Sequence, residues 1–411
     1  MTHSRLEISP VTTRPQRGDI MTDHLSQLLY AARWLGMLLV LGVHATAAFI
    51  NLNEASPHTL PLAATIWRSV ISYPFGRQAV IGFFVMSGFL VGGQVLARRR
   101  DAKPFLRDYY IHRIVRIYMV VIPAIALTFA FDTIGRNIFP ANSGGYPLFE
   151  GHYDPRYILT NLLNLQGIVA THYGTNGPLW SVAYEFWYYM VFPLLLAPMI
   201  VSFDPNRARL CASITMLFCI AITFRQIWFP FGLLIWTVGA IISRLKKPIV
   251  QSPGVACAQF VSIGLILGLS LSISAVHNHP WLQYISDMTT ALAFANLILT
   301  LRFVDRLNWK WLGWRGHKVL ADFSFTLYAI HNPTLLLSRA MITAVLGPTW
   351  SDGVAAPLQW VAMAVAMSLT IFLAYALSIF TEGEVGAARR LVKAALLRFW
   401  PEAGDGRSAS G

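Results

Sequence analysis

The sequence predicts an all-α integral membrane protein with about ten transmembrane helices and both termini in the cytoplasm. Of its 411 residues, 55% are hydrophobic and only 12% are charged, and the mean hydropathy is +0.52. A soluble protein carries about 25% charged residues. Long apolar runs and an uneven distribution of basic residues between alternate loops are the other two observations that predict this fold class.

The apolar runs are long enough, or nearly so, to cross about 30 Å of bilayer hydrocarbon as helices. The two runs between 209 and 243 are the shortest, so they give the weakest signal. In chain order the predicted spans are 30–51, 78–97, 114–132, 179–202, 209–225, 227–243, 253–275, 282–302, 319–346 and 356–381.

Basic residues predict the orientation of these spans. A cytoplasmic N-terminus places most of the 32 Lys and Arg residues in tails and loops on the cytoplasmic side, including Lys103, Arg107 and Arg244. This bias is the positive-inside pattern of multi-pass proteins. The net charge of +13 therefore reflects topology, and we expect an inner-membrane protein with no nucleic-acid partner.

The chain divides into one membrane domain over residues 25–385, a disordered cytoplasmic tail over 1–24 and a basic cytoplasmic tail over 386–411. The first apolar run follows a polar stretch and lacks a small-residue cleavage site, so it is not a removed signal peptide. The longest loop, 133–178, faces outward, and a loop of this length is more often functional than a mere connector. We expect it to cover an outward-facing site.

Three cysteines lie in predicted spans, at spacings that suit neither a zinc site nor a disulfide framework. Cys211, Cys219 and Cys257 are interpreted as small packing residues. We expect no metal and no permanently bound cofactor.

Arg33 and His44 are two ionisable residues within the first apolar run. Eleven residues of helix leave them about 20° apart around the axis and about 16 Å apart along it. Arg33 then lies at a membrane edge and His44 near the midplane, on one stripe. Intramembrane ionisable residues usually mark function, and a neutral imidazole is suited to act as a general base on a hydroxyl.

Arg113 and Arg116 begin the third span at an i,i+3 spacing, which places both guanidinium groups on neighbouring positions of one helix face. Two such groups match the oxygens of a phosphate. Simple orientation of the helix by positive charge explains them equally well.

The second span contains Phe83-Phe84, followed by Ser87 and Gly88. These two small residues allow another helix or a ligand to approach closely. Taken alone, Ser87 fits a packing role better than a hydrogen-bonding role.

The run Pro178–Tyr189 returns into the membrane after the long loop and carries Trp180, Ser181 and Glu185. An interfacial aromatic belt accounts for its Trp and Tyr residues. It does not account for Glu185, which at about 10 Å depth must be paired, protonated or hydrated.

Ser324, Tyr328 and His331 lie at i, i+4 and i+7 of the ninth span and therefore on one stripe. His331 is predicted at a depth close to that of His44. Pro333 removes a backbone N–H, opens the helical hydrogen-bond ladder and is expected to shape a cavity.

Together these motifs resemble the membrane-bound acyltransferase 3 family over about residues 25–385. The resemblance is carried by an arginine and a histidine separated by ten residues and by four further motifs in the same order. The matching residues are Arg33 with His44, Phe83-Phe84 with Ser87-Gly88, Arg113 with Arg116, Leu179-Trp180-Ser181 with Glu185 and Tyr188, and Ser324 through His331. Met119 replaces a common proline of the family, and Ala329 and Asn332 replace bulkier residues.

The resemblance implies a membrane O-acyltransferase that moves an acyl group, acetyl or succinyl, from cytoplasmic acyl-coenzyme A to a hydroxyl of an extracytoplasmic glycan or similar acceptor. His44 is then the expected catalytic base, and Arg33, Arg113 and Arg116 bind the donor. Glu185 and His331 are expected to assist catalysis, with Glu185 orienting His44 or binding the sugar. The residues expected to bind substrate or the oxyanion are Ser87, Trp180, Ser181 and Tyr328.

Two other functions fit the same charged residues. The first is a proton-coupled transporter or flippase, in which the membrane His and Glu relay protons. The second is a non-catalytic sensor or assembly factor. Within the enzyme hypothesis, both direct transfer and a two-step route through an acyl-enzyme remain open.

Overall fold

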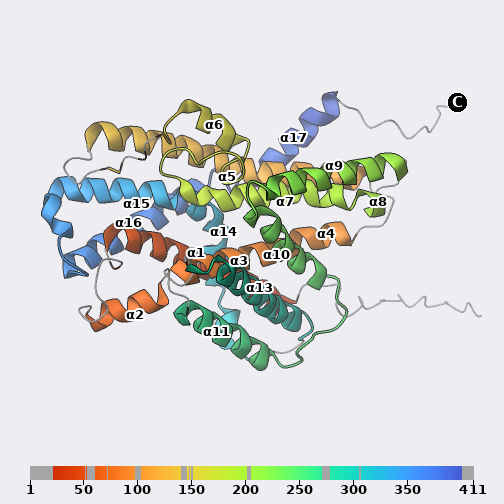
Figure 1. Cartoon of the computed structure of the whole chain (residues 1–411), viewed down its shortest axis with the longest axis horizontal. Helices are drawn as coiled ribbons and strands as arrows, with labels where there is room; N and C mark the ends of the chain where they lie inside the picture. Colours follow the sequence, from red (N-terminus) through yellow and green to blue (C-terminus); the bar gives the residue numbers. More distant parts are fainter. Residues whose placement is uncertain are drawn as a thin grey trace, which may run out of the picture.

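Helices lie side by side along the long axis of the molecule, as the ribbon shows (Figure 1). The computed structural model describes residues 22–50, 52, 61–71, 73–97, 103–139, 146–147, 149, 151–200, 205–270, 278–304 and 307–399. Residues 1–21 of the predicted N-terminal tail and 400–411 of the predicted C-terminal tail lie outside these ranges. Residues 140–145 of the predicted outer loop also lie outside them.

The described residues form helices and connecting turns, with no β-strand beyond one isolated bridge between Gln166 and Ala170. The helices, in order, are α1 Asp23–Phe49, α2 Leu62–Val70, α3 Tyr73–Ser87, η1 Gly88–Gly92, α4 Gly93–Leu96, α5 Lys103–Ile138, α6 Pro155–Leu162, η3 Gly177–Leu179, α7 Trp180–Leu195, α8 Ala197–Ile200, α9 Pro205–Thr223, α10 Trp228–Ile242, α11 Pro253–Ser270, α13 Pro280–Arg302, η4 Lys310–Gly313, α14 Gly316–Asp322, α15 Ser324–Leu346, η5 Pro348–Ser351, α16 Pro357–Ser378 and α17 Val385–Phe399.

A helix occupies each of the ten ranges that the sequence predicted as spans. Five segments within the described part of the chain are both long and apolar enough to cross a bilayer. They are Asp23–Phe49, Pro74–Leu96, Phe105–Ile138, Pro280–Arg302 and Pro357–Ser378. The all-α class and the membrane location are therefore confirmed.

Helix ends differ from the predicted span ends because hydropathy marks the apolar part of a helix, not the limits of its backbone hydrogen bonding. α1 begins seven residues before the predicted span, where the Thr22 side chain accepts a hydrogen bond from the Leu25 N–H at 3.2 Å. α5 extends from Lys103 to Ile138, so part of the predicted outer loop is helical. The predicted run 319–346 is broken at Phe323 into α14 and α15.

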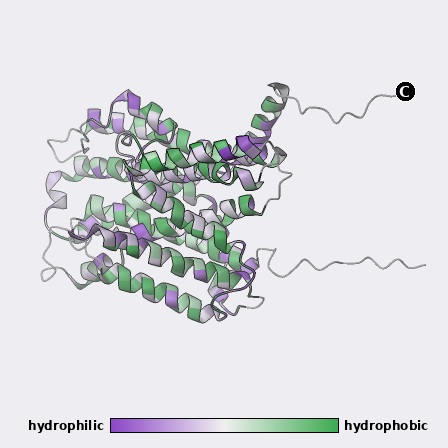
Figure 2. Cartoon of the chain, turned by 45° about the vertical axis from the view of Figure 1, so that its right-hand side comes forward, coloured by the Kyte–Doolittle hydropathy of each residue, from purple (hydrophilic) through white to green (hydrophobic). Residues whose placement is uncertain are grey.

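Apolar side chains cover much of the outside of the molecule, and Figure 2 shows hydrophobic residues along most of the helices. Leu217 of α9, Ile266 of α11 and Phe372 of α16 expose 65%, 62% and 69% of their surface. Such faces are stable in lipid and would aggregate in water. Cys211 also lies on an exposed face of α9, so its predicted packing role is wrong, whereas Cys219 is buried.

The helices that carry the predicted motifs pack against one another: α15 contacts α1, α5 and α16, and α3 contacts α1 and α10. α10 also approaches the junction of α3 and η1 closely, at Gly88 of η1 and Gly239 of α10. A methyl group on Gly88 would lie 1.8 Å from the Trp236 carbonyl oxygen, and one on Gly239 would lie 2.1 Å from the Val85 carbonyl oxygen. The close approach predicted at Ser87-Gly88 is therefore an approach of α10.

Candidate functional site

A pocket between α1, α3, α5, α7 and α15 brings together most of the predicted site residues. It has about 900 Å³ of empty space, including the part open to solvent, which is within the range of small-molecule sites. The predicted site residues that line it are Arg33, Ser87, Arg113, Arg116, Ser181, Glu185 and Tyr328. Guanidinium groups therefore reach the pocket from α1 and α5, a carboxylate from α7, and hydroxyl groups from α3, α7 and α15.

Glu185 is held in this pocket by a directed chain of hydrogen bonds. The Trp236 indole N–H donates to Ser87 Oγ at 3.0 Å, and Ser87 Oγ lies 3.0 Å from Tyr189 Oη. Tyr189 Oη donates to the Glu185 carboxylate. Because the phenol proton goes to Glu185, the single Ser87 proton goes to Tyr189. Ser87 therefore belongs to the support of Glu185, and its proton is not free for the oxyanion role that we expected.

Ser181 and Tyr328 form a second hydroxyl pair, with their oxygens 2.5 Å apart. Both hydroxyls also lie within hydrogen-bond distance of the Pro178 carbonyl oxygen, at 3.3 and 3.2 Å. One hydroxyl donates to the carbonyl and the other donates to its neighbour, so both protons are used in this conformation. The pair joins the start of α7 to the middle of α15.

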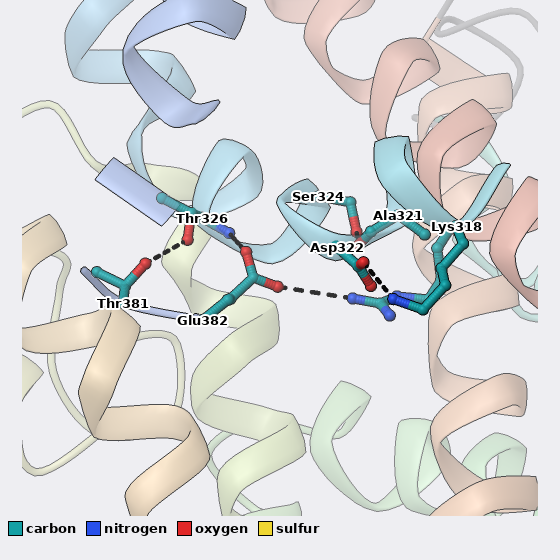
Figure 3. A network of polar contacts seen from close by, with 8 residues as sticks. Lys318, Ala321, Asp322, Ser324, Thr326, Thr381 and Glu382 are labelled. Carbon is teal, nitrogen blue, oxygen red and sulfur yellow. Dashed lines mark hydrogen bonds and ion pairs between the residues drawn. The ribbon is translucent and has the colours of Figure 1, made fainter. Parts of the chain in front are cut away.

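Arg33 meets a carboxylate that the sequence analysis did not single out. Its Nη2 atom lies 3.7 Å from Oε1 of Glu382, four residues after the end of α16. Glu382 Oε2 accepts a hydrogen bond from the Thr326 N–H at 3.0 Å, and Thr326 Oγ1 lies 2.8 Å from Thr381 Oγ1 (Figure 3). Burial raises the pKa of Glu382, while the Thr326 N–H and Arg33 oppose that shift by stabilising the carboxylate.

Arg113 and Arg116 of α5 both line the pocket, as their spacing on one face of the helix predicted. Arg113 donates to the side-chain oxygen of Gln94 at 3.4 Å, and its guanidinium lies 5.8 Å from the centre of the Tyr189 ring. Its Nε atom is buried and has no hydrogen-bond partner among the residues that the structure describes. Neither arginine forms an ion pair within the described ranges, so both guanidinium groups are available to an anion in the pocket.

His44 and His331 pack against each other, with ring centroids 4.9 Å apart and planes at 63°. Their predicted similar depth is confirmed. His331 Nδ1 lies 2.7 Å from the Tyr328 carbonyl oxygen, which only accepts. Nδ1 therefore carries a proton, and the buried Nε2, which has no partner in the described part of the chain, is the free acceptor.

The two histidines lie outside the set of residues that line the pocket. Tyr328 lines the pocket and also contacts the His331 ring, with centroids 5.7 Å apart. Tyr328 therefore lies between the pocket and the histidine pair. The hydrogen bond that Glu185 accepts comes from Tyr189, and within the described residues no bond joins it to His44, so that expectation is wrong for this conformation.

Trp180 is the other predicted site residue that does not line the pocket. Its ring packs edge to face against Tyr184 and Trp228, with centroids 5.2 and 5.7 Å away. Phe84 also contacts it, at 6.4 Å. Trp180 therefore belongs to the aromatic packing behind the pocket wall.

Hydrogen bonds from polar side chains join the segment before α7, at Thr175 and Asn176, to α15 directly beside His331. Pro333 has no N–H for the Ala329 carbonyl, and the Asn176 amide donates to that oxygen at 2.9 Å. The Asn332 amide donates to the Thr175 carbonyl oxygen at 2.6 Å. The carbonyl group that Pro333 leaves without a helical partner therefore binds the segment before α7. Asn332 adds a second hydrogen bond to the same segment.

Three residues of this site escaped the sequence analysis: Glu382, Tyr189 and Trp236. Glu382 is the acidic residue just beyond the last apolar run, at the same predicted membrane edge as Arg33, and that position was the available signal. Tyr189 and Trp236 lie among many aromatic residues. Tyr189 lies four residues after Glu185 on α7, so the helical repeat was an available signal for it. The role of Trp236 depends on a contact between helices, and nothing in the sequence separates it from membrane-belt residues.

The fold and pocket define a multi-pass helical membrane protein with one pocket that combines three arginines with a carboxylate, beside a pair of histidines. The family model described as an acyltransferase domain, acyltransferase 3, matches residues 29–379, which is most of the chain. The protein belongs to this family and is an acyltransferase. None of the curated proteins matches the chain, and none of the solved structures does.

Proposed function

We propose that this protein transfers an acetyl or succinyl group from cytoplasmic acyl-coenzyme A to a hydroxyl of an extracytoplasmic glycan or similar acceptor. One observation carries the proposal: a single pocket combines three arginines with Glu185 and Tyr328, and the Tyr328 ring contacts His331, which packs against His44. An anionic donor and a proton acceptor are thereby brought close to each other within the membrane.

In the proposed topology the protein lies in the inner membrane and crosses it ten times. Both termini are in the cytoplasm. Arg33 in the first helix and Glu382 after α16 lie 3.7 Å apart, so they are at the same end of the bundle. In this orientation the arginines face the cytoplasm, where acyl-coenzyme A is present. The outer segment beside His331 then faces the acceptor.

In the proposed reaction, donor phosphates bind near Arg113 and Arg116, with Arg33 close by, and the thioester extends towards Tyr328. The Tyr328 ring moves aside so that the thioester reaches His44. The acceptor oxygen attacks the acyl carbon, the C–S bond breaks, and the thiolate of coenzyme A leaves. His44 takes the hydroxyl proton and returns it to the thiolate.

The Glu185 carboxylate, oriented by Tyr189 and Ser87, then binds the acceptor or stabilises the imidazolium formed on His44. Because its hydrogen-bond chain already holds the carboxylate in place, Glu185 need not be reoriented during the reaction. Direct transfer needs no nucleophile other than the acceptor, and a histidine-bound acyl intermediate uses the same residues.

The test measures transfer of radiolabelled acetyl or succinyl groups from the coenzyme A thioester by purified protein without an ion gradient. His44→Ala is expected to lower the rate about 10²–10⁴-fold, because it removes the general base. His279→Ala is the matched control, since His279 is exposed at the start of α13. Wild-type rates in the His44 variant would contradict the catalytic assignment.

The acceptor is identified by mass spectrometry of surface glycans, glycolipids and metabolites from deletion and complemented strains. We expect an acetyl- or succinyl-sized mass increment that disappears on deletion and returns on complementation. Activity that requires a proton gradient but no thioester would instead favour the transporter.

A further inference from the structure

α17, the helix Val385–Phe399 that follows the last span, packs along α5, the helix that contributes Arg113 and Arg116 to the pocket. Lys393 Nζ lies 3.2 Å from Oδ2 of Asp108, which anchors the two helices. Arg389 lies one helical turn before Lys393 on the same face of α17. This places Arg389 against the part of α5 that carries Arg113 and Arg116.

The three guanidinium groups repel one another. Burial, and then the positive charges of Arg113 and Arg116, lower the pKa of Arg389. Nε of Arg389 and Nε of Arg113 are both buried without a hydrogen-bond partner, and no ion pair neutralises either side chain within the described ranges. Three neighbouring guanidinium groups, two of them with a buried N–H that has no partner within the described ranges, favour the binding of an anion.

Arg389 differs from the other two arginines in its position relative to the pocket. Arg113 and Arg116 line the pocket, whereas Arg389 lies outside its wall. In acyl-coenzyme A the order from the thioester is the pantetheine arm, the pyrophosphate and then the ribose with its 3′-phosphate. A donor that enters the pocket thioester first leaves the 3′-phosphate outermost.

We infer that Arg389 of the C-terminal helix, together with Arg113, binds the 3′-phosphate of the coenzyme A donor at the mouth of the pocket. The inference rests on the proposed function, since it assigns one group of the proposed donor. It gives α17 a binding role beyond orientation by positive charge. Arg390, the next residue, is exposed and has no part in this site.

The test compares the dissociation constants of coenzyme A and 3′-dephospho-coenzyme A for full-length purified protein. Neither probe requires knowledge of the acyl group or the acceptor. Arg389→Gln is expected to weaken coenzyme A binding about 10-fold, as for loss of one charge-assisted contact. The variant and the wild type are expected to bind 3′-dephospho-coenzyme A equally.

Arg390→Gln is the matched control, with an expected wild-type affinity for both probes, and Arg389→Lys is expected to recover part of the lost affinity. Equal weakening of both probes by Arg389→Gln would assign Arg389 to another part of the donor and overturn the inference. Unchanged affinity for coenzyme A would also overturn it. A thermal unfolding midpoint equal to that of the wild type shows that the variant is folded.

The same measurements in nanodiscs of phosphatidylcholine, with and without phosphatidylglycerol, separate the donor phosphate from a lipid phosphate. If Arg389 binds a lipid headgroup, its substitution leaves coenzyme A affinity unchanged in phosphatidylcholine, and the inference fails. If the wild type does not bind coenzyme A, both the proposed donor and this inference are wrong. If it binds coenzyme A with an affinity that Arg389→Gln does not change, only this inference is wrong.

Discussion

Individual hydroxyl protons determine what the pocket residues are able to do. Tyr189 gives its proton to Glu185, so Ser87 must give its own to Tyr189, and the Trp236 N–H fills the remaining site on Ser87. Every bond in this chain points towards the carboxylate. The chain therefore fixes the direction of the Glu185 side chain.

At the residue scale, Tyr189→Phe is therefore expected to lower kcat about 10- to 100-fold with little change in the KM for the donor. The substitution removes a charge-assisted hydrogen bond without touching the arginines. Steady-state kinetics with varied acyl-coenzyme A measures both constants.

Tyr188→Phe is the control for this substitution, because the Tyr188 hydroxyl donates to the Phe229 carbonyl oxygen behind the pocket. We expect it to keep the wild-type kcat. A Tyr189→Phe enzyme that raised KM and kept kcat would show that Tyr189 acts on donor binding instead.

At the scale of helices, two prolines create acceptors that neighbouring elements use. Pro333 frees the Ala329 carbonyl for Asn176, and Pro193 frees the Tyr189 carbonyl for the Tyr109 hydroxyl at 3.2 Å. Inside a membrane a freed carbonyl has no water to bind. Each proline therefore links its helix to a specific partner.

Asn176→Ala is expected to destabilise the protein by about 1–3 kcal/mol, because it leaves the Ala329 carbonyl buried and unpaired. Adding Pro333→Ala restores a backbone N–H for that carbonyl, so the double variant is expected to be more stable than Asn176→Ala alone. Thermal unfolding of the four proteins completes the double-mutant cycle. Additive losses would show that the two residues act independently.

The segment between α5 and α7 contains two neighbouring histidines, His152 and His172, whose contact is expected to depend on pH. His152 Nδ1 and His172 Nδ1 lie 3.3 Å apart, and His172 Nδ1 donates to the Gly174 carbonyl oxygen at 2.9 Å. Burial, and then the neighbouring His152, lower the pKa of His172 below its ordinary 6.5. A histidine whose pKa falls on folding favours the folded segment above pH 6.5 and loses that contribution as pH falls.

Acidification from pH 7.5 to pH 5 is therefore expected to speed hydrogen–deuterium exchange in residues 151–176, ahead of α5 and α15. Mass spectrometry of peptides from this segment measures the change. His172→Gln removes the titrating group, and its exchange in the segment is expected to vary less with pH. Equal pH dependence in both proteins would contradict the assignment.

At the scale of the whole molecule, one buried ion pair joins α3 to α13. Arg77 Nε and Nη2 donate to the Asp287 carboxylate at 2.9–3.2 Å, and Gln283 donates to the same group at 2.9 Å. The Arg77 guanidinium also lies 4.4 Å from the centre of the Trp228 ring. The structure thus places Arg77 inside the bundle with a partner 210 residues away in the sequence.

Asp287→Ala is expected to cost about 3–5 kcal/mol of stability, because it removes the carboxylate that the Arg77 guanidinium binds through three hydrogen bonds. The double variant Arg77→Met with Asp287→Ala is expected to lose less, since it removes both partners of the ion pair. Thermal unfolding in detergent ranks these proteins. The exposed Lys318–Asp322 pair supplies the control, and Lys318→Gln is expected to change the midpoint little.

The sequence by itself determined the all-α membrane class, the ranges of the main helices and the stripe that holds Arg33 and His44. Hydropathy and the helical repeat are properties of neighbouring residues, so a sequence displays them directly. The same repeat placed Arg113 and Arg116 on one face. It also placed Ser324 and Tyr328 on one face of the ninth span, and both line the pocket.

The tertiary structure alone decided which faces meet. It set His331 against His44 and brought Glu382 to Arg33. It also directed the hydrogen bond of Ser87 to Tyr189 and packed α17 against α5. Helical periodicity defines the residues on a face but not the helix opposite, because that choice depends on the packing of the whole bundle.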